Sequence, residues 1–313
     1  MKLRPLRVKK IKTHDSGDLA SSAKAAGWKR RRLKYIAVLP SFITLLNGAC
    51  GFIAIIFASR SQDYEWGLFF MRDNSMSTFS LAAYMIFLAM IADVLDGRVA
   101  RLTRTTSSFG GQLDSISDVI SFAVAPAFIS IKLVEFHLEQ LIFEPLWLSL
   151  LIERSIFFSA ILFVMCVAIR LARFNVENEE EETAHMNFSG LPSPAGAGVI
   201  VSLIIFHQYI LRILANSRPE LVNSFEMIAV SAFPIILLLT GLLMISRIRY
   251  PHLANQLLRG KKPLPALLAL FATAFFLIWN IQITTLIGFS AFALFGVFRW
   301  LFGRFGAAAK KQR

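Results

Sequence analysis

Long apolar runs, separated by short polar or charged segments, dominate this chain of 313 residues. A helix needs about 20 apolar residues to cross the hydrocarbon core of a bilayer. Eight runs approach that length, and we predict each to be a membrane-spanning helix: 36–58, 77–97, 116–135, 148–169, 192–211, 224–245, 263–280 and 283–300. The pattern predicts an all-α, polytopic membrane protein with about eight transmembrane helices.

Composition supports this prediction and adds an orientation. Hydrophobic residues make up 56% of the chain, more than a soluble fold of this size can bury. The net charge of +13 would suit a nucleic-acid partner in a soluble protein, but here the basic residues sort by side of the membrane. All but six of the 33 Lys and Arg lie in segments on one side, which the positive-inside rule assigns to the cytoplasm. We therefore expect a multi-pass protein of the cell (inner) membrane, with both termini cytoplasmic and no nucleic-acid partner.

The two ends of the chain differ from the spans. Residues 1–35 are polar and basic and lack the apolar core of a signal peptide, so we expect a disordered cytoplasmic tail. Residues 303–313 form a second basic tail. Both tails lie where basic residues fix orientation and can also meet anionic lipid headgroups.

Four carboxylates gather where the second and third predicted spans meet water. Asp93 and Asp96 are three residues apart, and Asp114 and Asp118 are four apart, so each pair shares one face of a helix. Carboxylates at the edge of hydrocarbon repel one another unless a cation or counter-charge neutralises them. Ligands that offer only oxygen favour Mg²⁺, Mn²⁺ or Ca²⁺, so we predict a site for one or two such ions.

Small residues and one arginine continue the same segment. Gly97 and Ala100 place almost no side chain beside the carboxylates, and Arg101 offers a guanidinium suited to phosphate oxygens. Gly110 allows close approach of the backbone at the start of the next helix. These features favour a substrate that bears a pyrophosphate. Close packing between membrane helices is the alternative explanation of the small residues.

The spacing Asp96-Gly97-x2-Ala100-Arg101-x8-Gly110-x3-Asp114-x3-Asp118 resembles the signature of the CDP-alcohol phosphatidyltransferases. The resemblance implies a six-helix catalytic core, here residues 36–250, followed by two additional helices in 251–302. It also implies metal-dependent transfer of a phosphatidyl group from CDP-diacylglycerol to an alcohol, with release of CMP. Relatives of this kind are usually homodimers, so we expect one here.

The same resemblance assigns roles to the residues of the motif. Asp93, Asp96 and Asp114 would bind Mg²⁺ or Mn²⁺, and Asp118 would accept the proton of the alcohol while lying near the second ion. The small residues and the arginine of the motif would line the nucleotide pocket: Gly97, Ala100, Arg101 and Gly110.

Three further segments resemble the bacterial phosphatidylserine synthase branch of the family. In 39–51, Thr44 and Asn47 are polar and one turn apart, and we predict that they contact the CDP-diacylglycerol, with bonding between helices as the alternative. In 168–175, Arg170 and Arg173 offer cations for the carboxylate of serine, with anchoring at the membrane edge as the alternative. The third segment, 188–198, we interpret as shaping the pocket.

Two alternatives remain at this stage. Within the family the acceptor could be choline, glycerol 3-phosphate or an inositol phosphate. Outside it, carboxylates in membrane spans also mark cation transporters. Transport sites usually lie near the midplane on broken helices, whereas these four Asp lie at one edge. The five histidines look scattered and unpaired, and we assign none of them a catalytic role.

Overall fold

The structure is a computed structural model, and it describes residues 41–60, 77–103, 108–141, 146–180, 190–248, 250, 276, 277 and 279–311. Helices account for nearly all of these residues, and no strand occurs among them. Seven helical segments of the described part are long and apolar enough to cross a membrane. The prediction of an all-α, multi-pass membrane protein is confirmed.

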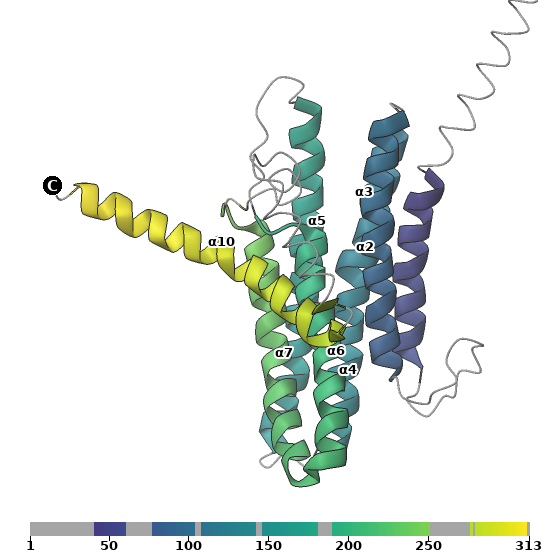
Figure 1. The fold of residues 1–313 in the computed structure, drawn as a ribbon, viewed down its shortest axis with the longest axis vertical. Helices are drawn as coiled ribbons and strands as arrows, with labels where there is room; N and C mark the ends of the chain where they lie inside the picture. The colour runs from purple at the N-terminus through teal and green to yellow at the C-terminus, as the bar shows by residue number, and fades with distance from the viewer. Residues whose placement is uncertain are drawn as a thin grey trace, which may run out of the picture.

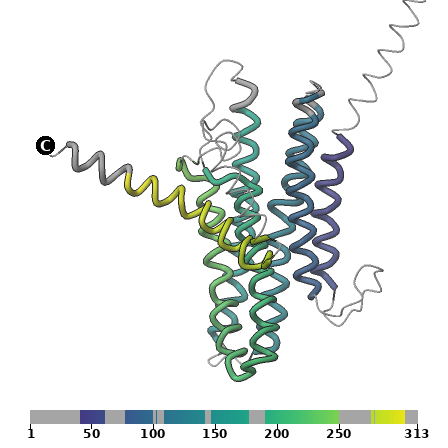
Figure 2. The backbone as a smooth tube through the Cα atoms, viewed as in Figure 1, coloured from purple at the N-terminus to yellow at the C-terminus, as the bar shows by residue number. Residues whose placement is uncertain are grey.

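The first six of these segments run roughly side by side as a bundle (Figures 1 and 2). The third of them, Phe109–Gln140, is one continuous span in which a π-helical segment joins two α-helices. In chain order the elements of the bundle are Ser41–Ser59, α2 (Thr78–Thr103), α3 (Ser108–Asp118), the π-helical segment (Val119–Val124), α4 (Ala125–Gln140), α5 (Leu146–Glu180), α6 (Ser193–Ser217), a 3₁₀ turn (Pro219–Leu221) and α7 (Val222–Ile245).

Several helices continue past the apolar runs that predict them. The run 148–169 lies within α5, which extends to Glu180, and all but the first residue of the run 77–97 lies within α2, which extends to Thr103. These helices therefore continue for several residues past their apolar runs. The tail 1–35 and nearly all of the predicted span 263–280 lie outside the described residues.

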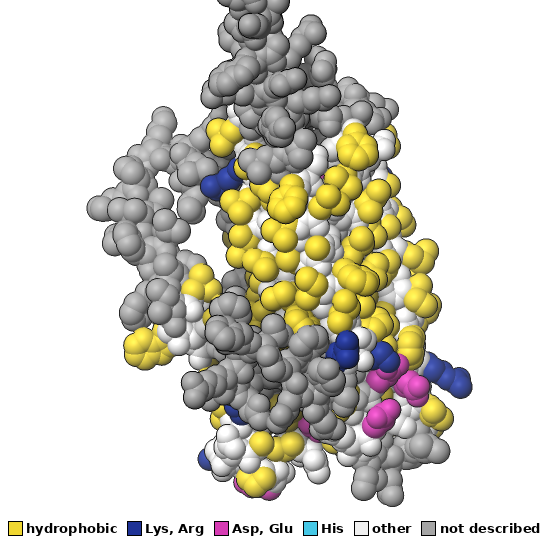
Figure 3. Space-filling view, turned by 90° about the vertical axis from the view of Figure 1, so that its right-hand side faces the viewer, with side chains coloured by type: hydrophobic (Ala, Val, Ile, Leu, Met, Phe, Trp, Pro, Cys, Tyr) yellow, Lys and Arg dark blue, Asp and Glu magenta, His cyan; other side chains and the backbone are white. Residues whose placement is uncertain are grey.

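The surface of the bundle is apolar over a broad band. On the face shown in Figure 3, hydrophobic side chains cover the middle of the molecule and charged side chains gather toward its lower end. Large apolar side chains such as Phe52, Phe158 and Ile235 are about 60% exposed in the absence of lipid. A surface of this kind matches contact with acyl chains better than contact with water.

Two glycines bring the first span against the third. A Cβ atom at Gly51 would lie 2.5 Å from the Oγ atom and 2.7 Å from the Cα atom of Ser121, closer than real side chains approach. One turn earlier, a Cβ at Gly48 would lie 3.2 Å from the Oγ of Ser117. The Ser121 hydroxyl donates to the backbone oxygen of Asn47 at 2.8 Å. This close contact places the polar face of the first span beside the helix that carries Asp118.

The expectation of scattered, unpaired histidines is wrong for two of them. The rings of His137 on α4 and His207 on α6 lie 4.9 Å apart between centroids. Nδ1 of His137 lies 3.2 Å from a carboxylate oxygen of Glu226 on α7, and all three side chains are buried. His137 lies 23 residues beyond Asp114 in the same span, roughly 34 Å at 1.5 Å per residue. The histidines therefore belong to the opposite end of the bundle from the carboxylates.

The last helix, α10 (Ile281–Lys311), does not run parallel to the bundle. Figure 1 shows it crossing the bundle obliquely, with its C-terminal half projecting away from the other helices. Its contacts are mainly with α6. The predicted span 283–300 is thus confirmed as a helix, and its direction is a feature that hydropathy does not predict.

Candidate active site

Three of the four predicted carboxylates come together. Asp93 on α2 and Asp114 and Asp118 on α3 each offer an oxygen atom, and these three oxygens all lie within 4.8 Å of one another. Asp118 is buried, and the other two are half-buried. Asp114 and Asp118 share a face because they are one helical turn apart. Asp93 joins this pair only because α2 and α3 lie together in the folded protein, which local spacing does not predict.

The first span holds two of the carboxylates by hydrogen bonds. The hydroxyl of Thr44 donates to Oδ2 of Asp96, and the side-chain amide of Asn47 donates to Oδ1 of Asp118 at 2.9 Å. Thr44 and Asn47 are fully buried. Their observed partners are carboxylates, so direct contact of either residue with CDP-diacylglycerol stays a prediction. Oδ1 of Asp96 is buried and has no hydrogen-bond partner among the described residues.

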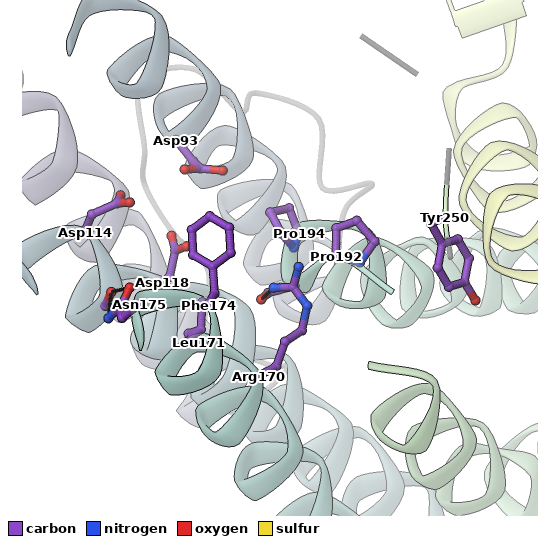
Figure 4. Close-up of a pocket in the computed structure, with 12 residues that line it drawn as sticks. Asp93, Asp114, Asp118, Arg170, Leu171, Phe174, Asn175, Pro192, Pro194 and Tyr250 are labelled. Carbon is purple, nitrogen blue, oxygen red and sulfur yellow. Dashed lines mark hydrogen bonds between the residues drawn. The ribbon is translucent and has the colours of Figure 1, made fainter. Parts of the chain in front are cut away.

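The carboxylate cluster opens into a cavity of about 350 Å³, which is within the size range of small-molecule sites. In Figure 4 the carboxylates lie on one side of this cavity, Arg170 faces them, and Tyr250 lies at the far end. The lining residues are Asp93, Asp114, Ser115, Asp118, Arg170, Leu171, Phe174, Asn175, Pro192, Ser193, Pro194 and Tyr250.

Of the two predicted serine-binding arginines, only Arg170 lines this cavity. Its Nη1 donates to the Ser193 hydroxyl at 2.5 Å, and its Nε is buried without a hydrogen-bond partner among the described residues. It is also the only cationic side chain among the lining residues that the structure describes. Arg173 is half-buried and is not part of the lining.

A polar pair that the sequence did not single out ties α5 to α3. The Asn175 amide donates to Oγ of Ser115 at 2.8 Å, and the Ser115 hydroxyl lies 3.0 Å from the Gly111 carbonyl oxygen, to which it can donate. Ser115 occupies an unspecified position of the carboxylate motif, and Asn175 ends the segment 168–175. The sequence offered one signal for these two residues: Ser115 directly follows Asp114, and Asn175 lies two residues after Arg173.

A tight turn forms another wall of the cavity. Gly190 has a φ of 93°, and a Cβ atom there would lie 2.1 Å from the backbone oxygen of Met244, so only glycine fits. The backbone N–H of Gly190 donates to the oxygen of Ile248 at 2.8 Å. This anchor directs Pro192, Ser193 and Pro194 into the lining, which confirms that the segment shapes the pocket.

The predicted donor-binding residues lie at the ends of α2 and α3. Gly97 is exposed and Gly110 is half-buried, and neither lines the cavity. Ala100 and Arg101 belong to the last turn of α2, and their side chains lie outside the described set. Their contact with a nucleotide stays a prediction.

The carboxylates suit a hard divalent cation. Ligands about 2.1 Å from Mg²⁺ lie up to about 4.2 Å apart, and the longer bonds of Ca²⁺ allow about 5 Å. The 4.8 Å spread of the three oxygens needs at most a small inward shift to meet these limits. Three carboxylates facing one arginine also leave negative charge that a cation would offset. Asp96, one helical turn from Asp93 on α2, has a buried oxygen without a hydrogen-bond partner among the described residues, but it lies outside the cluster of three oxygens.

The chain is similar in sequence to known proteins. A family model described as CDP-alcohol phosphatidyltransferase matches residues 37–297. A CDP-diacylglycerol–serine O-phosphatidyltransferase of Methanocaldococcus jannaschii is 35% identical over 225 residues, covering 72% of this chain and 79% of the relative. The protein of that name from Helicobacter pylori is 31% identical over 265 residues, covering 85% and 92%.

A third relative differs in the lipid that its name gives. An archaetidylserine synthase of Methanothermobacter thermautotrophicus is 31% identical over 225 residues, covering 71% of this chain and 73% of the relative. The matched region contains all four carboxylates, Arg170 and the turn at Gly190. On this match, which spans the site and most of the bundle around it, the chain belongs to the CDP-alcohol phosphatidyltransferase family.

Proposed function

We propose that the protein transfers the phosphatidyl group of CDP-diacylglycerol to L-serine, giving phosphatidylserine and CMP. The observation that carries this proposal is that one cavity holds both the carboxylate cluster and the half-buried Arg170 that faces it. The carboxylates suit a metal-bound pyrophosphate, and the arginine suits an acceptor that carries its own anion.

In the proposed reaction, the serine hydroxyl oxygen attacks the phosphorus that bears the diacylglycerol. The bond from that phosphorus to the CMP oxygen breaks, and CMP leaves with the bonding electrons. Asp118 takes the hydroxyl proton. Its hydrogen bond from Asn47 fixes the carboxylate, so that Oδ2 stays available for this proton.

Asp93, Asp96, Asp114 and Asp118 are the proposed ligands of one or two Mg²⁺ or Mn²⁺ ions. A bound ion would supply charge stabilisation for the departing pyrophosphate oxygens and help to align the phosphorus with the hydroxyl. The proposed contacts of the nucleotide and phosphates are Gly97, Ala100, Arg101 and Gly110. Thr44 and Asn47 hold Asp96 and Asp118 in place through hydrogen bonds.

Serine as the acceptor is supported by the chemistry of Arg170 and by the names of the relatives. Serine carries a carboxylate that choline, glycerol and inositol lack. The half-buried Arg170 guanidinium, whose buried Nε has no hydrogen-bond partner among the described residues, can bind it. The names of the three relatives agree on serine and differ in the lipid. Arg173, one turn further along α5, is the second candidate for this contact.

The assay for this function uses the purified protein in detergent with CDP-diacylglycerol, Mg²⁺ or Mn²⁺, and one alcohol at a time. We expect a product lipid with serine and none with choline, glycerol 3-phosphate or an inositol phosphate. A chelator should stop the reaction, and returned Mg²⁺ or Mn²⁺ should restore it. Product from another alcohol and none from serine would refute the acceptor assignment.

The two arginines offer a matched pair of variants. Arg170→Ala should raise the KM for serine at least tenfold, the loss expected for a charge-assisted contact of about 1.4 kcal/mol or more, with a smaller change for CDP-diacylglycerol. Arg173→Ala, outside the cavity lining, should change the KM for serine less. The reverse order in steady-state kinetics would move the serine contact to Arg173.

We also infer that the active site and both termini face the cytoplasm, from the distribution of Lys and Arg. The proposed assembly is a homodimer. Light scattering of the protein in detergent, corrected for bound detergent, checks this: a mass equal to one chain would contradict it.

A further inference from the structure

Tyr250 lies where the wall of the cavity meets α10. Its side chain lines the cavity and is only 7% exposed. Its hydroxyl turns away from the carboxylates and donates to the backbone oxygen of Ala293 on α10 at 3.0 Å (Figure 4). The helix α10, which lies outside the predicted catalytic region, therefore holds Tyr250, one of the residues that line the cavity.

A glycine on α10 makes room for this ring. A Cβ atom at Gly296 would lie 2.2 Å from Cε1 and 2.4 Å from Cζ of Tyr250, so any larger residue must displace the ring or the helix. The Phe292 ring lies 5.5 Å from the Tyr250 ring between centroids. Gly288, two turns earlier on α10, has no atom of the described residues within 4 Å of the corresponding Cβ position.

One turn before Ala293, the same face of α10 packs against the bundle through Phe289. Phe289 lies against Gly198 on α6, where a Cβ atom would lie 2.3 Å from the Phe289 ring. Its ring also stacks on Phe87 of α2, with centroids 5.8 Å apart and planes 11° apart. Phe289, Phe292, Ala293 and Gly296 follow helical i, i+3, i+4, i+7 spacing, so they form one continuous contact stripe.

The contact continues from Tyr250 to the arginine. Ile248, two residues before Tyr250, accepts a hydrogen bond from the backbone N–H of Gly190. Gly190 begins the turn that carries Ser193, and the Ser193 hydroxyl accepts a hydrogen bond from Arg170. A shift of Tyr250 therefore acts on the wall that holds Arg170, through covalent chain and two hydrogen bonds.

We propose that α10 sets the shape of the acceptor side of the cavity, with Tyr250 as the positioning residue through which it acts. Under this proposal the oblique helix α10 contributes to binding of the acceptor alcohol. The proposal rests on the proposed transfer to an alcohol. The carboxylate side is held separately by the first span, through Thr44 and Asn47. A disturbance at α10 should therefore weaken acceptor binding before it affects the donor.

The test compares Gly296→Ala with Gly288→Ala in the full-length protein, since the two variants add the same methyl group to the same helix. Gly296→Ala should raise the KM for serine roughly tenfold, because small displacements of binding groups are costly, while kcat and the KM for CDP-diacylglycerol change less than about twofold. Gly288→Ala should match the wild type. Tyr250→Phe keeps the ring but removes the bond to Ala293, and should raise the KM for serine by a smaller factor.

Each outcome bears on one proposal. A wild-type protein that transfers to no alcohol refutes the proposed function. An active wild type in which Gly296→Ala behaves like Gly288→Ala refutes the role of α10, as does a fall in kcat with unchanged KM for serine. If Gly296→Ala does not fold, by thermal unfolding in detergent, then Tyr250→Phe decides: an unchanged KM for serine overturns the inference.

Discussion

The carboxylates of the site differ in their neighbours, and these differences support the separate roles proposed for them. Asp93 and Asp114 are half-buried and contribute to the oxygen cluster that suits a cation. Asp118 is buried at the inner end of the cluster, where one oxygen accepts a hydrogen bond from Asn47. An oxygen held in one orientation beside the cavity is well placed to accept a proton, because proton transfer requires a short and aligned contact.

Asp118→Asn tests this role at a single atom. The amide retains an oxygen that can accept the bond from Asn47, so the fold should be kept, but it cannot take up a proton. Transfer should fall at least about 100-fold, the usual range for loss of a general base. Binding of CMP, measured by calorimetry in the presence of Mg²⁺, should change much less. Turnover at the wild-type rate would remove Asp118 from the mechanism.

At the scale of residues, the sequence predicted what local spacing controls. Helical spacing pairs Asp93 with Asp96 and Asp114 with Asp118, whereas Arg170 was identified from the resemblance of segment 168–175 to the family. Ser115 and Asn175 are 60 residues apart and meet only because α3 packs beside α5. Tyr250 and Ala293 are likewise brought together by the path of α10, and no local pattern predicts such pairs.

Among the elements, the contact between the first span and the third controls the site most directly. It depends on a helix separation so small that the side of Gly51 facing Ser121 has no room for a methyl group. The same contact sets the position of Thr44 and Asn47 along the helix axis, so that each can donate a hydrogen bond to its carboxylate. Close packing of small residues is a common source of stability between membrane helices.

Gly51→Ala should therefore lower both stability and activity. Overpacking of a tight contact costs about 1–3 kcal/mol, which a lower unfolding temperature in detergent would reveal. Gly111→Ala on α3 is the control, since no atom in the described part of the chain lies within 4 Å of its Cβ position and alanine favours a helix. Equal effects of the two substitutions would show that Gly51 is not a packing position.

The polar group at the other end of the bundle joins three elements. His137, His207 and Glu226 come from α4, α6 and α7, and the Gln208 amide lies 3.2 Å from Nδ1 of His207. Sequence analysis missed this group because its members lie in three different spans. Buried polar side chains that meet between helices favour one register of the helices that carry them.

Glu226→Ala should destabilise this end of the bundle and spare the chemistry. Removal of the Glu226 carboxylate leaves Nδ1 of His137 buried without this polar neighbour, which should lower the free energy of unfolding by about 1–3 kcal/mol. The unfolding temperature should fall, while kcat and KM of the folded protein stay near wild type, because the group lies roughly 34 Å from Asp114 along the span. Glu226→Gln, which retains a polar partner, should have the smaller effect. A selective loss of kcat at unchanged stability would contradict a structural role.

For the whole molecule, the arrangement of the spans agrees with the division of charge. The cavity is built at the end of the bundle where α2 and α5 end, α3 and α6 begin and the chain leaves α7. At this end the chain carries Arg98, Arg101 and Arg104 around the end of α2 and five Lys and Arg in 247–262, whereas the connection 181–189 carries none. Hydropathy predicted the class of fold and the six bundle helices, but not the oblique direction of α10, because apolar content does not distinguish a helix that crosses the bundle from one that lines it.

The location of the C-terminus tests the span count. Eight spans return the chain to the side on which it starts, so a reporter fused after Arg313 should be cytoplasmic. A matched reporter inserted between α6 and α7, at residue 218, should lie on the other side. A C-terminus found outside would mean that residues 251–302 cross the membrane once rather than twice, and the inferred topology would be wrong.

The π-helical segment Val119–Val124 follows Asp118 directly and interrupts an otherwise regular span. Such a turn holds one residue more than α-helical winding would use, and it shifts the phase between the helix before it and the helix after it. Because the wider turn absorbs the extra residue, a return of the same six residues to regular winding would rotate Asp114 and Asp118 by about 100° relative to the face of α4 that carries His137. The geometry of the carboxylate cluster thus depends on the winding of this stretch as well as on its chemistry, and an inserted residue there would be more harmful than a deleted one, which regular winding absorbs.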